Sequence, residues 1–395
     1  MGLWAAALGA AIGTPCLALT QQPNDVPSLG RRVTIESSVL DEARTLWVWT
    51  PPGYSETGPG LPVLYLLDPD IHYRHVTALV QFLSLYLRAP EMLVVGVVNT
   101  SRTRDFTPAP PAEGSGPAPG GADRFRRFLV EEVQPHIQRT YRTAPFSMLI
   151  GHSLGGLFAL HTAVGEPGAF AAYVAVSPSL YWADSLVLRS ARSAIERRTD
   201  LPRFLFLGLA GNEPPNIAAT TRQLSASLAR ASPPRLQWES ADFPGENHLT
   251  VPLPAFRDAI RWLFADWPIS IEGTAARIVE ERSLAAFDEH FERLSRRFGY
   301  SVQPTELTIS IVGDRLYRRE AFDQAIALFA KRVTLYPESP EAHDELARGY
   351  EAAGQLAPAV ASYERAFALA EGQQHPSLDA IRERLARARG VVRER

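Results

Sequence analysis

Hydrophobic and polar positions follow two different patterns along the chain, and the pattern changes near Pro268. Before that point, short apolar runs such as residues 62–68 and 93–99 alternate with amphipathic stretches. Short apolar runs bounded by turn residues are typical of buried strands, and the stretches between them are typical of helices. Two early runs, residues 33–39 and 46–50, indicate an antiparallel start to the sheet. We therefore predict an α/β fold with a mostly parallel sheet flanked by helices.

After Pro268 the periodicity is helical. Residues 271–300 place apolar side chains on one face and predict one helix that connects two domains. From Glu306 the sequence has an internal period of 34 residues, which is typical of tetratricopeptide helix pairs, and residues 377–389 indicate a charged final helix. Two repeats are fewer than such arrays usually need for stability, so we expect them to pack against the connecting helix or the first domain. This favours a structural role, with a protein partner bound by the repeats as the alternative.

The first 18 residues are uncharged and apolar over about the length of a signal-peptide core. Glycine and proline make so short a span a poor membrane anchor. Cleavage near Ala18 would remove Cys16, the one cysteine of the chain, and with it any disulfide or thiol chemistry. We predict a periplasmic or secreted protein, with a cytoplasmic location as the alternative. The expected segments are a signal peptide (1–20), an α/β domain (30–268), a connecting helix (269–303) and tetratricopeptide-like repeats (304–395).

Composition narrows the classes of function. Apolar residues make up 46% of the 395 residues and charged residues 21%, which is the balance of an ordinary globular protein. The formal net charge of −3 gives no reason to expect nucleic acid or an anionic membrane as a partner. His72 and His75 lie three residues apart, but no second histidine or acidic pair accompanies them. We therefore predict no metal site and no cofactor.

Residues 151–156, Gly-His-Ser-Leu-Gly-Gly, carry the strongest chemical signal. They follow an apolar strand pattern and precede a helical one, which predicts a sharp turn with Ser153 at its tip. Flanking glycines suit this turn because its backbone segments come too close for a Cβ atom. Ser153 is therefore the candidate nucleophile of an α/β-hydrolase.

A serine nucleophile needs a base, and in α/β-hydrolases the acid and the histidine follow the serine in the chain. His248 is the candidate base, because it lies in a turn-rich loop between a strand pattern and a helix pattern. The other downstream histidines lie in predicted helices: His161, His290, His343 and His375.

Glu213 is the candidate for the carboxylate that orients the base. It lies in the loop after the apolar run 203–208, which is the clearest strand signal between Ser153 and His248. Three other carboxylates are rivals: Asp242, Asp184 and Glu246. Asp242 is the best of these, because it ends the next predicted strand.

The oxyanion formed by serine attack needs two backbone N–H donors. Leu154, directly after the nucleophile, provides the first. The second is expected in the loop after the strand at 62–68. Because Pro69 has no N–H group, we assign this donor to the backbone of Asp70.

Two arginines are candidates for substrate binding. Arg102 and Arg104 follow the run 93–99, at a strand end where α/β proteins build ligand sites. Their guanidinium groups suit an anionic or oxygen-rich substrate. A clamp between Arg104 and Asp105 that only fixes the loop is the alternative.

Two aromatic residues follow another predicted strand, at 173–177. Tyr181 and Trp182 would wall an acyl or aromatic pocket, and a role as packed loop anchors is the alternative. Residues 107–121 contain too much proline and glycine for regular structure, which indicates a surface loop, with a flap over the site as the alternative.

Five motifs occur in the order seen in one known family: LYLLD at 64–68, RDFTP at 104–108, GHSLGG at 151–156, SPSLYW at 177–182 and GENH at 245–248. Through them, residues 30–268 resemble the Putative esterase family of α/β-hydrolases, and most closely its siderophore-esterase branch. That family includes enterochelin esterases, S-formylglutathione hydrolase, feruloyl esterases and mycolyltransferases. The resemblance implies carboxylester hydrolysis through an acyl-enzyme, with Ser153 and His248 in matching positions. Pro69 departs from the pattern, since many members have glycine there, and this bears on the second oxyanion donor.

These observations predict a serine esterase that acts on a small ester or lactone, with a siderophore-like ester among the candidate substrates. An acyltransferase that passes the same acyl group to an alcohol is one alternative. An interaction protein that uses the hydrolase scaffold without catalysis is another.

Overall fold

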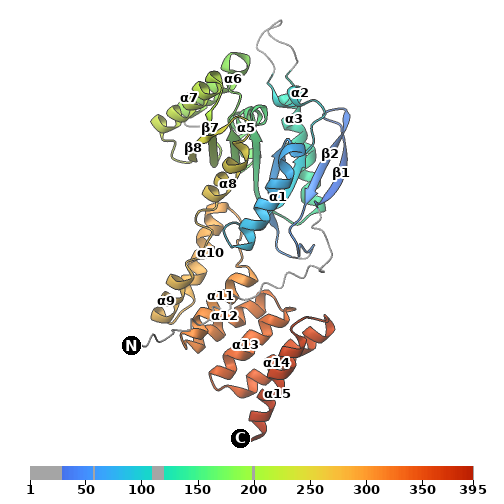
Figure 1. The fold of residues 1–395 in the computed structure, drawn as a ribbon, viewed down its shortest axis with the longest axis vertical. Coiled ribbons are helices and arrows are strands. Elements are labelled where there is room, and N and C mark those ends of the chain that lie inside the picture. The colour runs from blue at the N-terminus through green and yellow to red at the C-terminus, as the bar shows by residue number, and fades with distance from the viewer. Residues whose placement is uncertain (1–28, 57, 109–119, 198–200, 395) are drawn as a thin grey trace, which may run out of the picture.

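The computed structural model describes residues 29–56, 58–108, 120–197 and 201–394. The predicted signal peptide and most of the predicted loop at 107–121 lie outside the described residues. An α/β part built on one sheet is followed by an array of helices (Figure 1).

Within the described residues, eight strands form one sheet in the order β1-β2-β4-β3-β5-β6-β7-β8. They are β1 (Arg31–Ser37), β2 (Glu42–Trp49), β3 (Leu61–Leu67), β4 (Leu93–Val97), β5 (Thr143–His152), β6 (Ala172–Val176), β7 (Phe204–Asn212) and β8 (Gln237–Asn247). β2 pairs antiparallel with both β1 and β4, and all other neighbours pair parallel. The predicted mostly parallel sheet with an antiparallel start is confirmed.

Helices cover both faces of the sheet. Along β3, Val63 and Tyr65 belong to one core cluster and Leu64 and Leu66 to the other, as the period of two in a strand requires. The first cluster packs against α3 (Ala122–Arg127), the π-helical turn η1 (Phe128–Val133), α4 (Gln134–Thr140), α5 (Leu154–Gly165), α6 (Trp182–Arg197) and α7 (Pro215–Ala231). The second packs against α1 (Pro69–Leu85), α8 (Pro252–Leu263) and α10 (Ala285–Phe298). Two short helices lie in loops, α2 (Arg102–Phe106) and η2 (Pro167–Ala169).

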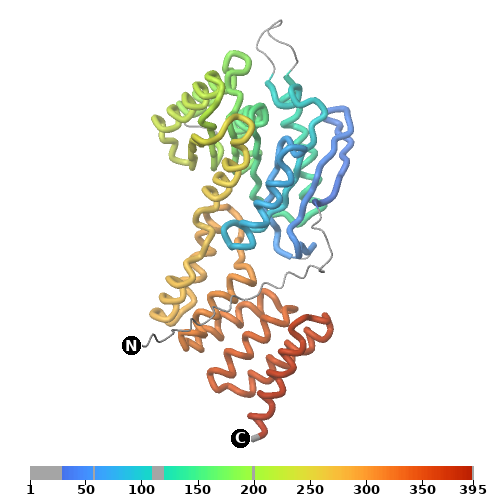
Figure 2. Tube along the Cα trace, in the orientation of Figure 1, coloured from blue at the N-terminus to red at the C-terminus, as the bar shows by residue number. Residues whose placement is uncertain are grey.

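The helices after the sheet stack side by side (Figure 2). Besides α10 they are α9 (Ile271–Glu281), α11 (Glu306–Arg318), α12 (Phe322–Leu335), α13 (Pro340–Ala352), α14 (Leu356–Gly372) and α15 (Leu378–Glu394). α11 and α13 begin 34 residues apart, as do α12 and α14. Gly313 lets α11 approach α12 closely, because a Cβ atom there would lie 2.3 Å from the Phe329 ring. The helical C-terminal region is present, and its assignment to tetratricopeptide repeats stays a prediction.

Residues 269–303 form two helices where one connecting helix was predicted. Arg282 adopts a left-handed backbone conformation (φ 49°) that ends α9, and α10 begins shortly after it. α10 joins the two parts of the chain: the Phe298 ring lies 5.3 Å from that of Phe146 in β5, whereas Phe287 belongs to the core of the helical array. The array is therefore attached to the sheet through an apolar contact. None of the described helices combines the length and apolarity that a membrane span requires.

Candidate active site

Ser153 lies on a strained turn between β5 and α5. Its backbone has φ 58° and ψ −116°, a combination that L side chains rarely adopt. Gly151 permits the turn, because a Cβ atom there would lie 2.2 Å from the carbonyl oxygen of Gly155. The turn presents Ser153 at the carboxyl edge of the sheet, where the neighbouring parallel strands also end.

The extended pairing of β7 and β8 brings a carboxylate and a histidine together. Both strands continue past their predicted ends, and Asn212 pairs with Asn247 in parallel register. Gly211 allows this close approach, because a Cβ atom there would lie 2.5 Å from the backbone of β8. The residues that follow the pair are Glu213 and His248, which therefore leave the sheet side by side.

Ser153, His248 and Glu213 form one chain of hydrogen bonds. His248 Nε2 lies 3.0 Å from Ser153 Oγ, and His248 Nδ1 lies 2.8 Å from Glu213 Oε2. The Glu213 side chain is fully buried, whereas that of His248 is 24% exposed. This arrangement can pass the Ser153 proton to Nε2 while the carboxylate keeps Nδ1 protonated.

None of the rival carboxylates forms a hydrogen bond or ion pair with His248 among the described residues. Asp184 is 98% exposed and accepts a hydrogen bond from Arg189 at 2.7 Å. Asp242 lies within β8, where it pairs with Leu209, and it precedes the strand end by five residues. Glu246 lies near the end of the same strand. Of the four carboxylates considered, Glu213 is the one that the structure brings to the histidine.

The register of β3 and β5 determines where the two assigned oxyanion donors, Asp70 and Leu154, lie. Leu66 pairs with Ile150, so the two strands end together and lead into the first turns of α1 and α5. Asp70 is the second residue of α1 and Leu154 is the first residue of α5. Backbone N–H groups in the first turn of a helix lack helical partners and attract negative charge. Both assigned donors thus lie in such turns.

Pro69 fits its place at the start of α1. Proline is favoured at the first helical position, where no N–H donor is needed and its φ suits the helix. Its ring packs on β4 where Gly96 makes room, because a Cβ atom on Gly96 would lie 2.6 Å from Pro69 Cβ. The departure from the family pattern at Pro69 is therefore accommodated by the neighbouring strand.

Arg102 is tied to the turn that precedes α1. Its Nε donates to Asp68 Oδ1 at 2.7 Å and its Nη2 donates to Asp68 Oδ2 at 2.9 Å. Asn99 Nδ2 donates to the same carboxylate at 2.7 Å. Asp68 is buried and has a left-handed backbone (φ 50°), so these bonds hold a strained turn directly before Asp70. Arg102 remains 37% exposed, and its contact with a substrate stays a prediction.

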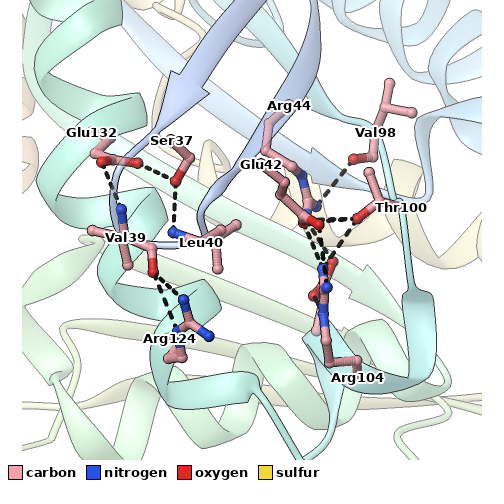
Figure 3. A network of polar contacts seen from close by, with 11 residues as sticks. Ser37, Val39, Leu40, Glu42, Arg44, Val98, Thr100, Arg104, Arg124 and Glu132 are labelled. Atoms are coloured by element: carbon pink, nitrogen blue, oxygen red, sulfur yellow. Dashed lines mark hydrogen bonds and ion pairs between the residues drawn. The ribbon is translucent and has the colours of Figure 1, made fainter.

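Arg104, in α2, belongs to a polar network with Glu42, Arg44 and Thr100 (Figure 3). Its guanidinium pairs with Glu42 at 2.6 Å and with Asp105 at 2.8 Å. The fully buried Arg44 pairs with the same two carboxylates, each at 2.8 Å. The Arg104 hydrogen bond is the main reason that the pKa of Glu42 falls to about 2. This geometry is that of a loop clamp, and a substrate contact by Arg104 stays a prediction.

Ser179 is a candidate site residue that the sequence reasoning missed. Its Oγ lies 3.3 Å from Ser153 Oγ, and its N–H donates to the Ser153 carbonyl oxygen at 3.1 Å. Its place in the Ser-Pro-Ser turn after β6, the strand beside β5, was the available signal. Two residues on, Tyr181 is 39% exposed, whereas Trp182 packs against the core. Of the two predicted aromatic residues, Tyr181 is the more accessible to a substrate.

Three histidines lie behind His248: His152 and His72 are buried and His75 is half-buried. The His152 ring centroid is 4.7 Å from that of His248 and 6.0 Å from that of His72, which is 5.2 Å from His75. Burial, aided by neighbouring histidines, lowers the pKa of His152 to about 3 and that of His72 to about 4. These two rings are therefore uncharged at neutral pH. Among the described residues, no group of three or more His, Cys, Asp or Glu side chains is arranged to hold a metal ion.

Residues 37–220 match the protein family described as "Putative esterase". The chain is 31% identical over 260 residues to the ferri-bacillibactin esterase BesA of Bacillus subtilis, a match that covers 56% of this chain and 85% of that protein.

Solved structures share the fold. An IroE-like serine hydrolase from Shewanella oneidensis has a TM-score of 0.64 at 27% identity, over 76% of this chain and 98% of its own. An uncharacterised protein from Capnocytophaga ochracea has a TM-score of 0.61 at 18% identity, over 91% of this chain and 99% of its own. Because the sheet ends before residue 268, a fold likeness over 91% of the chain extends into the helical array.

Proposed function

This chain belongs to the Putative esterase family, and on that premise we propose that it is a serine carboxylester hydrolase that works through an acyl-enzyme. The observation that carries the proposal is the chain of hydrogen bonds from Ser153 Oγ through His248 to Glu213. A hydroxyl, an imidazole and a buried carboxylate in this order form the set that activates serine for attack on an acyl carbon.

In the first half of the proposed reaction, Ser153 Oγ attacks the ester carbonyl carbon while its proton moves to His248 Nε2. The carbonyl electron pair moves to oxygen, and this oxyanion accepts hydrogen bonds from the N–H groups of Leu154 and Asp70. The C–O bond to the alcohol then breaks, and His248 returns the proton to the leaving oxygen. The alcohol departs, and the acyl group remains on Ser153 as an ester.

In the second half, a water molecule gives a proton to His248 and attacks the acyl carbon. Collapse of the new oxyanion breaks the bond to Ser153 Oγ, which takes the proton back, and the carboxylic acid leaves. Glu213 stabilises the His248 imidazolium in both halves. Since Ser153 donates its proton to His248 in this mechanism, we assign the Ser179 hydroxyl as the donor to Ser153 Oγ, 3.3 Å away, where it would support the charge that develops.

The proposed substrate is a small ester or lactone. The relative named for ferri-bacillibactin supports a siderophore ester as the first candidate. For the helical array we propose a structural role, which the packing of α10 on the sheet supports. A periplasmic or secreted location stays a proposal that rests on residues 1–20.

The proposal is tested by Ser153→Ala and His248→Ala in hydrolysis of p-nitrophenyl acetate. Each should remove nearly all turnover, and the double variant should lose little more, because the two residues act as one unit. Ser84→Ala and His136→Ala, on α1 and α4, are matched controls that should keep the turnover of the natural chain. Substantial turnover in a folded Ser153→Ala protein contradicts the mechanism. A screen that includes a ferric trilactone siderophore then ranks the substrates.

A further inference from the structure

We propose that Ile71, Leu249 and Leu253 form an apolar rim that binds an apolar group of the ester next to the scissile bond. The proposal rests on the proposed esterase function and deepens it, since it names the class of substrate that the site favours. The three side chains are 67%, 82% and 58% exposed. Single exposed apolar residues are common on protein surfaces, so the proposal depends on where these three lie.

Ile71 and Leu253 lie in the first turns of α1 and α8, two helices that pack against each other. The ring of Phe256 in α8 lies 5.2 Å from that of His72 and 6.1 Å from that of His75, so these faces of the two helices meet. Leu253 is three residues before Phe256 and shares its face, one turn nearer the start of α8. Both helices begin at the carboxyl edge of the sheet, so the first turn of α8, with Leu253, lies beside the first turn of α1, with Ile71.

Leu249 is held out by a rigid turn. Asn247 Oδ1 accepts hydrogen bonds from the N–H groups of Leu249 at 2.9 Å and of Thr250 at 3.2 Å. The Asn247 N–H in turn donates to Thr250 Oγ1 at 3.1 Å. Because the backbone is fixed on both sides of it, the exposure of Leu249 is a property of the folded site.

All three residues adjoin the proposed machinery. Leu249 directly follows His248, Ile71 directly follows Asp70, and Leu253 lies on the helix that starts after the His248 turn. His72, whose ring meets Phe256 of α8, is uncharged at neutral pH, because burial lowers its pKa to about 4.

The position of the rim identifies its occupant. A partner protein or a second copy of the chain that stayed on these residues would cover His248 and the path to Ser153. An apolar group that arrives and leaves with each turnover is compatible with catalysis, and the substrate is such a group. The acyl chain and the alcohol of an ester share this apolar chemistry, so the experiment below separates them.

The test compares kcat/KM across two series of neutral esters for the full chain and for Leu249→Ser, Leu253→Ser and their double variant. The acyl series runs from p-nitrophenyl acetate to hexanoate, and the alcohol series from ethyl acetate to hexyl acetate. Phe82→Ser is the matched control, since Phe82 is also 58% exposed on α1 but lies near its far end. Size-exclusion chromatography of each variant reports any change of oligomeric state.

We expect the natural chain to favour the longer ester in at least one series. Each rim variant should reduce that preference, measured as the ratio of kcat/KM for the long and the short ester, by on the order of fivefold, and the double variant should reduce it further. Phe82→Ser should leave the ratio as in the natural chain. A ratio that is the same in the natural chain and the rim variants overturns the inference, and so does a rim variant that changes the oligomeric state. A natural chain that hydrolyses none of the esters, the ferric siderophore included, instead removes the proposed function.

Discussion

Acid should destabilise the α/β domain through the histidines buried behind His248, and His72 is the clearest case. Its ring packs against His75 and Phe256, and the charged groups that face it are those of Asp68 and Arg102. Burial, with a smaller effect from His75, lowers its pKa from 6.5 to about 4. Neither ring nitrogen has a hydrogen-bond partner in the described residues.

The sign of the effect follows from proton binding. Between pH 6.5 and about 4, the unfolded chain binds a proton on His72 and the folded chain does not, so the free energy of unfolding falls as the pH falls. At about 1.4 kcal/mol per pH unit, a drop from pH 6.5 to about pH 5 removes roughly 2 kcal/mol. The contribution of the uncharged His72 ring to the free energy of unfolding is fully present above pH 6.5. Glu42, whose pKa is lowered to about 2, loses its contribution only below its unfolded value of 4.5.

His72→Phe removes the titrating group and keeps an aromatic ring against Phe256. Urea unfolding at pH 7 and pH 5, followed by tryptophan fluorescence, reports on the α/β domain, because all seven tryptophans precede Pro268. Relative to the natural chain, the variant should gain about 2 kcal/mol in unfolding free energy between the two pH values. A difference that stays constant from pH 7 to pH 5 refutes the reasoning.

Three further outcomes are expected. Glu213→Gln should lower turnover of p-nitrophenyl acetate by about 10- to 10,000-fold, with Asp242→Asn nearly neutral; the reverse ranking moves the acid to Asp242. Arg102→Lys should lower kcat more than it changes KM, because a lysine cannot make both hydrogen bonds to Asp68 that hold the turn before Asp70, the proposed second oxyanion donor; an unchanged kcat counts against that role. A chain that ends at residue 271 should have a lower melting temperature than one that ends at 303, because it lacks the core side chains of Leu294 and Phe298. Calorimetry of the two chains measures this difference. Turnover in both should stay within about tenfold of the full chain; a folded shorter chain without turnover would place part of the site in the helical array.

The turn at Ser153 and the mostly parallel sheet could be predicted because they depend on local patterns. Gly151 and Ser153 mark a strand-to-helix turn by residue type alone, and alternating apolar runs indicate parallel strands wherever their partners lie. Glu213 and His248 could be proposed from chain order, but the reason that they meet is the pairing of Asn212 with Asn247. This pairing could not be predicted from the sequence, because the glycines and the proline around it are typical of turns.

The rest of the site depends on contacts between segments that are distant in the chain. Ser179 meets Ser153 only because β5 and β6 are neighbours, and Arg102 is bound by a carboxylate 34 residues away. The break between α9 and α10 rests on a left-handed residue, Arg282, whose type does not indicate that conformation. Patterns along one sequence carry no information about such pairings, so these contacts could be identified only in the folded structure.

Covalent labelling with a fluorophosphonate tests the central claim most directly, because this reagent reacts with a serine that a histidine activates. The natural chain should take up one label per molecule, and peptide mass spectrometry should locate the adduct on Ser153. Ser153→Ala should abolish the label, and His248→Ala should slow it strongly. A folded natural chain that takes no label, or a Ser153→Ala protein that labels as fast as the natural chain, contradicts the assignment of Ser153 as the nucleophile.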